Sequence, residues 1–409
     1  MTAQSLGDTN RVMVPAASTQ PSPTSPRHGG AWWLASLWIP AGLLSWAASR
    51  RPETIEHYYS RGLYPPLART LSRVSGWLPF SCAELLVTLL GIGGLCLVAR
   101  GVVRLRTSSE RWRAGAALRR WVPRLLGAGA VTYFAFLLVW GLNYRRLPFA
   151  TLAGLAPSQV EVPALERLGA ELVNITNTLR ADVREDAAGV MQLDGDLADA
   201  LERANGGLEE AARTYAPLAG DWGPPKPVYA SAVMSFLGIR GIYFPFTGEA
   251  NVNTSCPAST IPFSACHELA HLRGFAREDE ANFIAFVACR AHTDADYRYS
   301  GYLAATLYVL KALPAGATRS RLLTSFAPGV QRDLAEQRRW RERYQTPLAD
   351  LSERVNDTYL RANGEAAGTR SYGRMVQLLV AEWQNERRPA PAGIAPRLPG
   401  GPGERPATQ

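Results

Sequence analysis

The sequence contains few of the residues expected of a disulfide-rich or nucleic-acid-binding protein. Five cysteines in 409 residues are too few for a disulfide framework at this length, although a bond between two of Cys256, Cys266 and Cys289 is chemically possible. The net charge of +9 would suit an anionic partner, but no nucleic-acid-binding motif is present. We therefore expect no nucleic acid among the partners.

A recognisable signal peptide is also lacking. The first long apolar run begins only at Ala31 and has no clear small-residue cleavage site at its end. Residues 1–30 are rich in Ser, Thr, Pro and Gln, which predicts a disordered N-terminal tail. Residues 387–409 are rich in Pro, Gly and Arg, which predicts a second disordered tail.

Three apolar segments predict a membrane anchor over residues 31–143. They are residues 31–48, 83–103 and 122–143, and each approaches or exceeds the length needed to cross a bilayer. Residues 31–48 contain no charge and carry tryptophans near both ends, as membrane–water interfaces favour. Core helices of soluble proteins usually carry a polar face, so the alternative, a buried hairpin in a large soluble core, explains these segments less well.

The arginines between the second and third segments predict the orientation of the anchor. This loop contains one acid, Glu110, and six arginines. The arginines are Arg104, Arg106, Arg111, Arg113, Arg119 and Arg120. Because Lys and Arg are retained on the cytoplasmic side, we expect a multi-pass cell-membrane protein with a cytoplasmic N-terminus and an extracytoplasmic C-terminal domain. The mixed charges of residues 49–82 give a weaker bias.

Residues 144–386 are predicted to form this extracytoplasmic domain, a metallopeptidase-like fold that should be mainly helical with a small sheet (α+β). Residues 228–253 are β-branched and aromatic with glycine punctuation, which favours short strands. Apolar spacing near three and four predicts helices. The predicted helices cover residues 161–186, 195–216, 281–291, 297–313, 320–345 and 371–384.

His267-Glu268-x-x-His271 is the ligand pattern of a zinc peptidase helix. On a helix the two histidines share one face, so both rings can bind one ion while Glu268 points toward a bound water. With 5 His in the chain, the pattern should occur by accident only on the order of a few times in a thousand. The alternative is an amphipathic helix with surface or core histidines.

A catalytic zinc also needs a third protein ligand and an open position. Gly274 can take the positive φ that ends the first helix and turns the chain back toward the metal. Arg277 stands where a metzincin has its last histidine, and arginine cannot bind zinc. Glu278, Asp279 and Glu280 follow. A solvated helix N-terminus would favour these acids as well.

Several stretches resemble a bacterial family classed as a domain of unknown function, number 3810. They are Tyr58–Pro65, Pro79–Ser81, Phe246–Asn251, His267–Asn282 and Ser371–Gly373. Glu278 to Asn282 is also similar to the Glu-x-x-Ala-Asp/Asn segment of gluzincin peptidases. This likeness implies that Glu278 is the third ligand, with Asn282 as partner of a ligand histidine. Glu280 remains the rival ligand, and the resemblance supplies no substrate.

These observations predict a membrane-anchored zinc metallopeptidase that cleaves peptide bonds. Zinc would activate a water, and Glu268 would act as the general base. Tyr302, Tyr372, His292 and Arg374 are candidate oxyanion donors by chemistry alone. The expected partners are the bilayer and a peptide or protein substrate.

Two other functions remain open at this point. The first is a catalytically inactive zinc-binding sensor or peptide-binding domain on the membrane anchor. The second is an intramembrane protease, which the charges of residues 263–286 disfavour.

Overall fold

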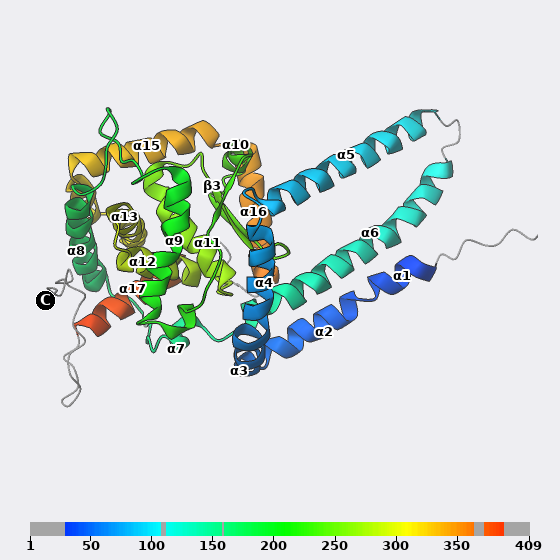
Figure 1. The fold of residues 1–409 in the computed structure, drawn as a ribbon, viewed down its shortest axis with the longest axis horizontal. Helices are drawn as coiled ribbons and strands as arrows, with labels where there is room; N and C mark the ends of the chain where they lie inside the picture. The colour runs from blue at the N-terminus through cyan, green and yellow to red at the C-terminus, as the bar shows by residue number, and fades with distance from the viewer. Residues whose placement is uncertain (1–28, 108–111, 158, 364–371, 388–409) are drawn as a thin grey trace, which may run out of the picture.

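The computed structural model describes residues 29–107, 112–157, 159–363 and 372–387. The described chain is mostly helical, with one small sheet. It consists of a globular body and a set of apolar helices that project from one side of it (Figure 1). The two predicted tails lie outside the described residues, apart from Gly29, Gly30 and Arg387.

Two of the projecting helices have the length and composition of membrane spans. They are α5 (Cys82–Thr107) and α6 (Trp112–Val139), and the apolar stretches are Cys82–Val103 and Trp121–Val139. Only 6% of the most apolar part of the first stretch and 22% of that of the second is buried. A core hairpin would bury these side chains, so the soluble-core alternative does not describe this fold.

The first predicted span is divided into two short helices, α1 (Gly29–Ala35) and α2 (Trp38–Ser49). Neither is as long as a membrane span requires. The division lies before Pro40, which has no N–H to donate to the carbonyl of Ser36 four residues earlier. Both helices lie along α6, where Trp38 stacks on Tyr133 at a ring distance of 5.3 Å.

The segment between α2 and α5 forms part of the globular body. It contains α3 (Pro52–Thr54), the π-helix η1 (Ile55–Leu63) and α4 (Tyr64–Gly76). Glu56 and Arg146 form a buried ion pair at 2.9 Å, with side chains 6% and 3% exposed. The domain predicted to begin at residue 144 is therefore packed against residues that precede α5.

The start of α5 is tied to the sheet. The carboxylate of Glu249 accepts backbone hydrogen bonds from Cys82 and Ala83 at 3.0 and 2.8 Å. These N–H groups have no partner within the helix. Lys226 binds Glu249 at 2.8 Å and also donates to the carbonyls of Ser75, Leu78 and Phe80.

Most of the body is helical, as the sequence predicts. Its larger helices are α8 (Val162–Arg180), α9 (Leu197–Ala212), α11 (Ile261–Leu272), α12 (Glu278–Ala291), α13 (Ala295–Ala312), α14 (Ala317–Thr324), α15 (Pro328–Tyr344), α16 (Pro347–Ala362) and α17 (Tyr372–Glu386). The shorter ones are α7 (Phe149–Leu152), η2 (Gly141–Arg145), η3 (Ala216–Leu218) and η4 (Ala258–Thr260). The single helix predicted over 320–345 is instead α14 and α15, because Pro328 begins a new helix.

The predicted small sheet is present beside α11. Its strands are β1 (Lys226–Val228), β2 (Gly241–Phe244) and β3 (Glu249–Asn253), in the order β1-β3-β2. Strand β1 is parallel to β3, and β2 is antiparallel to it. Strand β2 is therefore an edge strand, and it contacts α11.

One part of the region predicted as strands is helical, namely α10 (Ser231–Phe236). Just before this helix, the carboxylate of Glu84 accepts the backbone N–H groups of Tyr229 and Ala230 at 2.9 and 2.6 Å. Glu84 lies in the first turn of α5. The helix thus begins on a contact that is distant in sequence, which local periodicity does not reveal.

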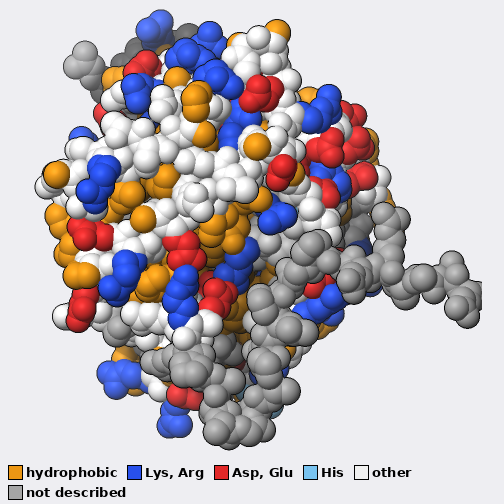
Figure 2. Space-filling view, turned by 90° about the vertical axis from the view of Figure 1, so that its left-hand side faces the viewer, with side chains coloured by type: hydrophobic (Ala, Val, Ile, Leu, Met, Phe, Trp, Pro, Cys, Tyr) orange, Lys and Arg blue, Asp and Glu red, His pale blue; other side chains and the backbone are white. Residues whose placement is uncertain are grey.

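Helices α11 and α12 form the centre of the core. Leu269, Ala270, Phe283 and Ile284 are 0% exposed. Cys256, Cys266 and Cys289 are buried free thiols without a disulfide. The face turned away from the projecting helices carries scattered acidic and basic side chains with small hydrophobic groups between them (Figure 2).

Candidate metal centre

Gly274 reverses the chain after α11, as the sequence predicts. It has φ +81°, its N–H donates to the His271 carbonyl at 2.9 Å, and the N–H of Phe275 donates to Ala270 at 3.1 Å. These two bonds define a Schellman motif, which favours glycine at this position. The turn brings Glu278, the first residue of α12, back to the histidines of α11.

The structure brings His267, His271 and Glu278 together. The two Nε2 atoms are 3.1 Å apart, and the Glu278 carboxylate oxygens lie 3.4 Å from His267 and 3.6 Å from His271. A tetrahedral zinc ion with donors about 2.0–2.1 Å away separates neighbouring donors by about 3.3 Å. The two distances to Glu278 involve different carboxylate oxygens, and one donor atom from each of the three residues lies within 4.8 Å of the others, so the set can hold one metal ion.

Glu280, the rival third ligand, faces other partners. One of its carboxylate oxygens accepts the backbone N–H of Phe149 at 2.9 Å and a guanidinium N–H of Arg277 at 2.9 Å. Its side chain is 5% exposed. Glu280 thus joins α12 to α7, whereas Glu278 faces the histidines.

The two histidine rings differ in how their second nitrogen is held. His271 Nδ1 donates to the carbonyl of Phe275 at 2.8 Å, which leaves Nε2 free for a metal. Asn282 lies beside His267 and favours its protonated ring, but no hydrogen bond of ordinary length reaches the buried Nδ1 of His267. Asn282 therefore stands where the sequence analysis expects the partner of a ligand histidine.

The charges of the three groups are strongly coupled. Burial and the neighbouring His267 lower the pKa of His271 to about 4, against the opposing effect of Glu278. Burial acts against ionisation of Glu278, but both histidines lower its pKa to about 2. Burial also opposes protonation of His267, yet the Glu278 carboxylate raises the pKa of this ring above its usual 6.5. The site is thus a carboxylate beside one neutral and one readily protonated imidazole.

Glu268 is buried beside these ligands, with 4% exposure. Burial raises its pKa to about 8, with a further contribution from Glu278, while His267 and the backbone N–H of Tyr243 oppose the rise. Gly241 leaves room for the carboxylate, since a Cβ there would lie 2.5 Å from Glu268 Oε1. Strand β2 therefore fixes the position of Glu268.

Side chains from the base of the projecting helices hold the end of α11. Trp140 Nε1 donates to the His271 carbonyl at 3.1 Å, and the Tyr64 hydroxyl donates to the Leu272 carbonyl at 2.8 Å. Arg146 donates to the Gly274 carbonyl at 3.1 Å. The last carbonyls of a helix lack partners within it, and here residues near the membrane candidates supply those partners. No local sequence pattern marks Trp140, Tyr64 or Arg146 for this role.

Three of the four predicted oxyanion donors have other contacts or lie outside the description. Arg374 pairs with Asp279 at 3.3 Å. Tyr302 packs against Phe286 at a ring distance of 5.4 Å. The side chain of Tyr372 lies outside what the structure describes.

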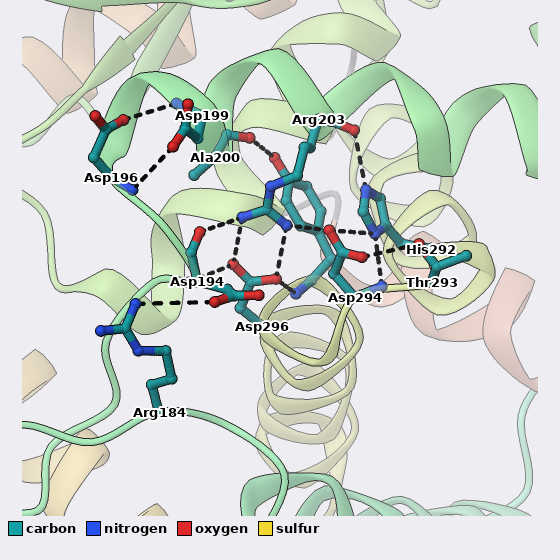
Figure 3. A network of polar contacts seen from close by, with 11 residues as sticks. Arg184, Asp194, Asp196, Asp199, Ala200, Arg203, His292, Thr293, Asp294 and Asp296 are labelled. Carbon is teal, nitrogen blue, oxygen red and sulfur yellow. Dashed lines mark hydrogen bonds and ion pairs between the residues drawn. The ribbon is translucent and has the colours of Figure 1, made fainter.

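The fourth, His292, lies at the C-terminal end of α12, about 20 Å along the helix from Glu278. It belongs to a polar network around Arg203 (Figure 3). His292 Nε2 donates to the Arg203 carbonyl at 3.0 Å, and Arg203 binds Asp294 and Asp296. This network joins α9 to α13 and does not reach the metal ligands.

Tyr359 of α16 is a residue near the site that the sequence analysis missed. Its ring contacts those of Phe136 and Tyr144, each at 6.1 Å. Partial burial raises its pKa to about 12, and the negative charge of Glu278 contributes to the rise. No local motif marks Tyr359, and α16 itself was not among the predicted helices.

The fold and the site define a mostly helical protein with two candidate membrane-spanning helices and a His-His-Glu cluster that fits a metal ion. The chain belongs to the family described as "Protein of unknown function (DUF3810)", whose profile matches residues 59–380. The predicted resemblance to this family is thus confirmed. No curated protein and no solved structure matches the chain.

Proposed function

We propose that this protein is a membrane-anchored zinc metallopeptidase of gluzincin-like design. His267, His271 and Glu278 would hold the zinc, with Asn282 beside His267. The observation that carries the proposal is the convergence of the three residues next to the buried carboxylate of Glu268: the two Nε2 atoms are 3.1 Å apart, and each has a Glu278 oxygen at 3.4 or 3.6 Å. A histidine pair serving only to stabilise the fold would not need a third donor at zinc spacing.

Zinc at this position supplies a Lewis acid that acidifies a water and polarises the scissile carbonyl. Glu268 accepts the proton of the attacking water and returns it to the leaving amine. Without the metal, burial raises the pKa of Glu268 to about 8. The charge of a zinc ion beside it would lower that pKa, so that the carboxylate would be ionised and able to accept the proton of the water. The N–H of Tyr243 and the space above Gly241 keep the carboxylate aimed at the reacting atoms.

Strand β2 offers a place for the substrate backbone. It is an edge strand of the sheet, lies against α11 and exposes Ile242 at 45%. An extended peptide can pair with such an edge through main-chain hydrogen bonds. A peptide bound in this way would pass alongside Glu268.

We further propose that α1 and α2 together form a third pass beside α6, which completes a three-helix anchor. The outer ends of α5 and α6 and the start of α1 lie away from the body (Figure 1), so the arginine-rich loop and the N-terminus share one side. The positive-inside rule makes that side cytoplasmic. The body, including residues 52–81, then faces the extracytoplasmic side.

The test is a comparison of the purified wild type with Glu268→Gln. Both should contain one zinc per chain by elemental analysis, and only the wild type should cleave cell-envelope proteins, with turnover at least about 1000-fold faster. Peptide binding without cleavage by the wild type would indicate a zinc-binding sensor instead. Absence of zinc from the wild type would remove both functions.

A further inference from the structure

The exposed hydrophobic side chains of the body are gathered on one side. Outside the apolar helices α1, α2, α5 and α6, the exposed large hydrophobic residues in the described body are Tyr58, Leu63, Val74, Trp77, Leu78, Val162, Tyr229, Val233, Phe236, Ile242, Leu323, Leu348, Leu351, Val355 and Tyr359. All except Val162 and Leu323 lie in a few segments of the body. These segments are η1, α4 with the two residues that follow it, α10 with the preceding Tyr229, β2, and α16. We call these segments the anchor-side surface.

Contacts place most of the anchor-side surface next to the ends of the candidate spans. Trp77, 82% exposed, precedes the start of α5 by five residues. Tyr229 is held by Glu84 in the first turn of α5, and Tyr359 meets Phe136 of α6. Figure 1 shows α4, α10 and α16 on the side of the body from which α5 and α6 leave.

Within the described residues, helix α16 presents an exposed apolar face. Leu348, Leu351 and Val355 are 57%, 57% and 62% exposed, and with Tyr359 their spacing of three, four and four residues forms one stripe. A soluble surface rarely leaves such a stripe uncovered. The opposite face of the body has mixed charges instead (Figure 2). The lipid surface is the occupant that continues directly from α6 through the Phe136–Tyr359 contact.

The metal ligands lie at the same level. Trp140 immediately follows the apolar stretch Trp121–Val139, donates to the carbonyl of His271 and has its ring 6.1 Å from the His271 ring. Tryptophan is enriched at the membrane–water interface. His271 therefore lies one side chain away from the end of a membrane span.

Glu278 is the most exposed of the three metal ligands. Glu278 has 31% of its side chain exposed, whereas that of His271 is 8% exposed. Tyr359 is close enough for the Glu278 charge to act on it. Tyr359, at one end of the apolar stripe of α16, is thus near the exposed side of the metal ligands.

We propose that the His267–His271–Glu278 site acts on polypeptide segments held at the membrane surface, namely the stretches that adjoin a membrane span or lipid anchor of another protein. The apolar stripe of α16 and the end of α4 rest on the lipid and set the height of the site. This inference depends on the proposed peptidase function. It adds the class of substrate.

The first experiment measures lipid contact without using activity. The full chain is placed in nanodiscs that contain a phospholipid with a diazirine on its acyl chain, and cross-links are mapped by mass spectrometry after illumination. We expect cross-links on α5 and α6 and on Leu348, Leu351 or Val355, with none on Leu323 of α14. Cross-links confined to α1, α2, α5 and α6 would overturn the proposal.

The second experiment maps new protein N-termini in cells that express the wild type or Glu268→Gln. We expect wild-type cleavage sites within about six residues of a span or lipid anchor, a distance of about 20 Å at full extension. Val355→Glu should reduce these cleavages about tenfold, because a charge in the apolar stripe disfavours lipid contact. Leu323→Glu is the matched control on α14 and should leave them unchanged.

The outcomes distinguish the membrane-surface substrate class from the peptidase function on which it depends. Cleavage sites spread through soluble proteins or distant domains would overturn the membrane-surface substrate class and leave the peptidase function intact. Glu268-dependent release of fatty acid or lysophospholipid would identify a lipid substrate and overturn it as well. Absence of any Glu268-dependent product would remove the peptidase function together with this inference.

Discussion

Glu278 and Glu280 are two residues apart in the first turn of α12, yet they face different partners. Each residue of a helix is rotated by about 100° from the one before, so these carboxylates point to nearly opposite sides. Glu278 faces the histidines and Glu280 faces Phe149 and Arg277. The sequence shows both acids, but the orientation of α12 relative to α11 decides which of them faces the histidines.

Exchange of each acid for its amide separates their roles. We expect Glu278→Gln to weaken zinc binding by at least about 100-fold, beyond the 10- to 100-fold cost of losing an outer partner. Glu280→Gln should retain zinc affinity and lose about 1–3 kcal/mol of unfolding free energy, because its charge-assisted bonds are weakened. Chelator competition and denaturant titration measure the two effects. The opposite pattern would make Glu280 the ligand.

His267 should make zinc binding depend on pH. A proton and zinc compete for its Nε2, and the pKa of this ring is raised above 6.5 by Glu278. Zinc affinity should therefore fall about tenfold per pH unit as the pH drops below that pKa. His271, with a pKa of about 4, and Glu278, with a pKa of about 2, are already deprotonated there and add no slope.

Zinc affinity should depend on pH through Glu268 as well. Its pKa is about 8 without the metal, and the charge of zinc beside it lowers that pKa, so zinc binding releases a proton from Glu268. In the wild type, affinity should continue to rise up to about pH 8. In Glu268→Gln the rise should end at the pKa of His267. Isothermal titration with a competing chelator at several pH values provides the measurement, and an affinity that is constant between pH 5.5 and 7 would contradict the assigned role of His267.

At the scale of elements, the turn at Gly274 joins the two halves of the site. Its positive φ of +81° permits the Schellman motif, which places the Phe275 carbonyl on His271 Nδ1 and returns Glu278 to α11. A Cβ at this position would lie 2.9 Å from the ring of Tyr64 and 3.1 Å from Asn143 Oδ1. The motif therefore depends on glycine for both its backbone conformation and its space.

Gly274→Ala should accordingly destabilise the fold by at least about 1–2 kcal/mol, the cost of the left-handed conformation alone, and should weaken zinc binding. Gly76→Ala is the matched control, since a Cβ at Gly76 meets nothing within 4 Å. Thermal unfolding with and without zinc measures both quantities. Equal stability of the two variants would show that the turn tolerates a side chain.

Elements with local signals were predictable, and those that rest on distant contacts were not. His267, His271 and Gly274 form a local motif on one helix and its end, so sequence spacing was sufficient. Helix α10 begins on Glu84, which is more than a hundred residues away. Residues 49–82 are predicted only as a loop between two membrane segments. Helix α4 within them belongs to the body, because its Tyr64 binds the end of α11.

At the scale of the whole molecule, the projecting helices and the body are joined by buried contacts. Arg146 is buried against Glu56, and the carbonyls of His271 and Leu272 depend on Trp140 and Tyr64. A fragment of residues 144–386 would lose the hydrogen bonds of Trp140 and Tyr64 to the end of α11 and the Glu56 partner of Arg146. At about 0.5–1.5 kcal/mol for each hydrogen bond, and with the buried side chains of Tyr59, Tyr64 and Ala68 also removed from the core, the loss is large beside the roughly 5–15 kcal/mol that stabilises a domain.

We therefore expect fragment 144–386 to lack a cooperative unfolding transition and to bind no stoichiometric zinc, whereas the full chain in detergent does both. Circular dichroism and elemental analysis of the two proteins make the comparison. A fragment that folds and binds zinc as the full chain does would show that residues 52–81 and Trp140 serve only as an attachment.

Strand β3 has a consequence for how the protein responds to its surroundings. Its Glu249 accepts hydrogen bonds from the first residues of α5. The strand also contacts α11, the helix that carries both histidines. In a bilayer thinner than α5 requires, α5 would tilt, and the tilt would act on the strand. The acyl-chain length of the lipids would thereby affect the position of the histidines without any bound ligand.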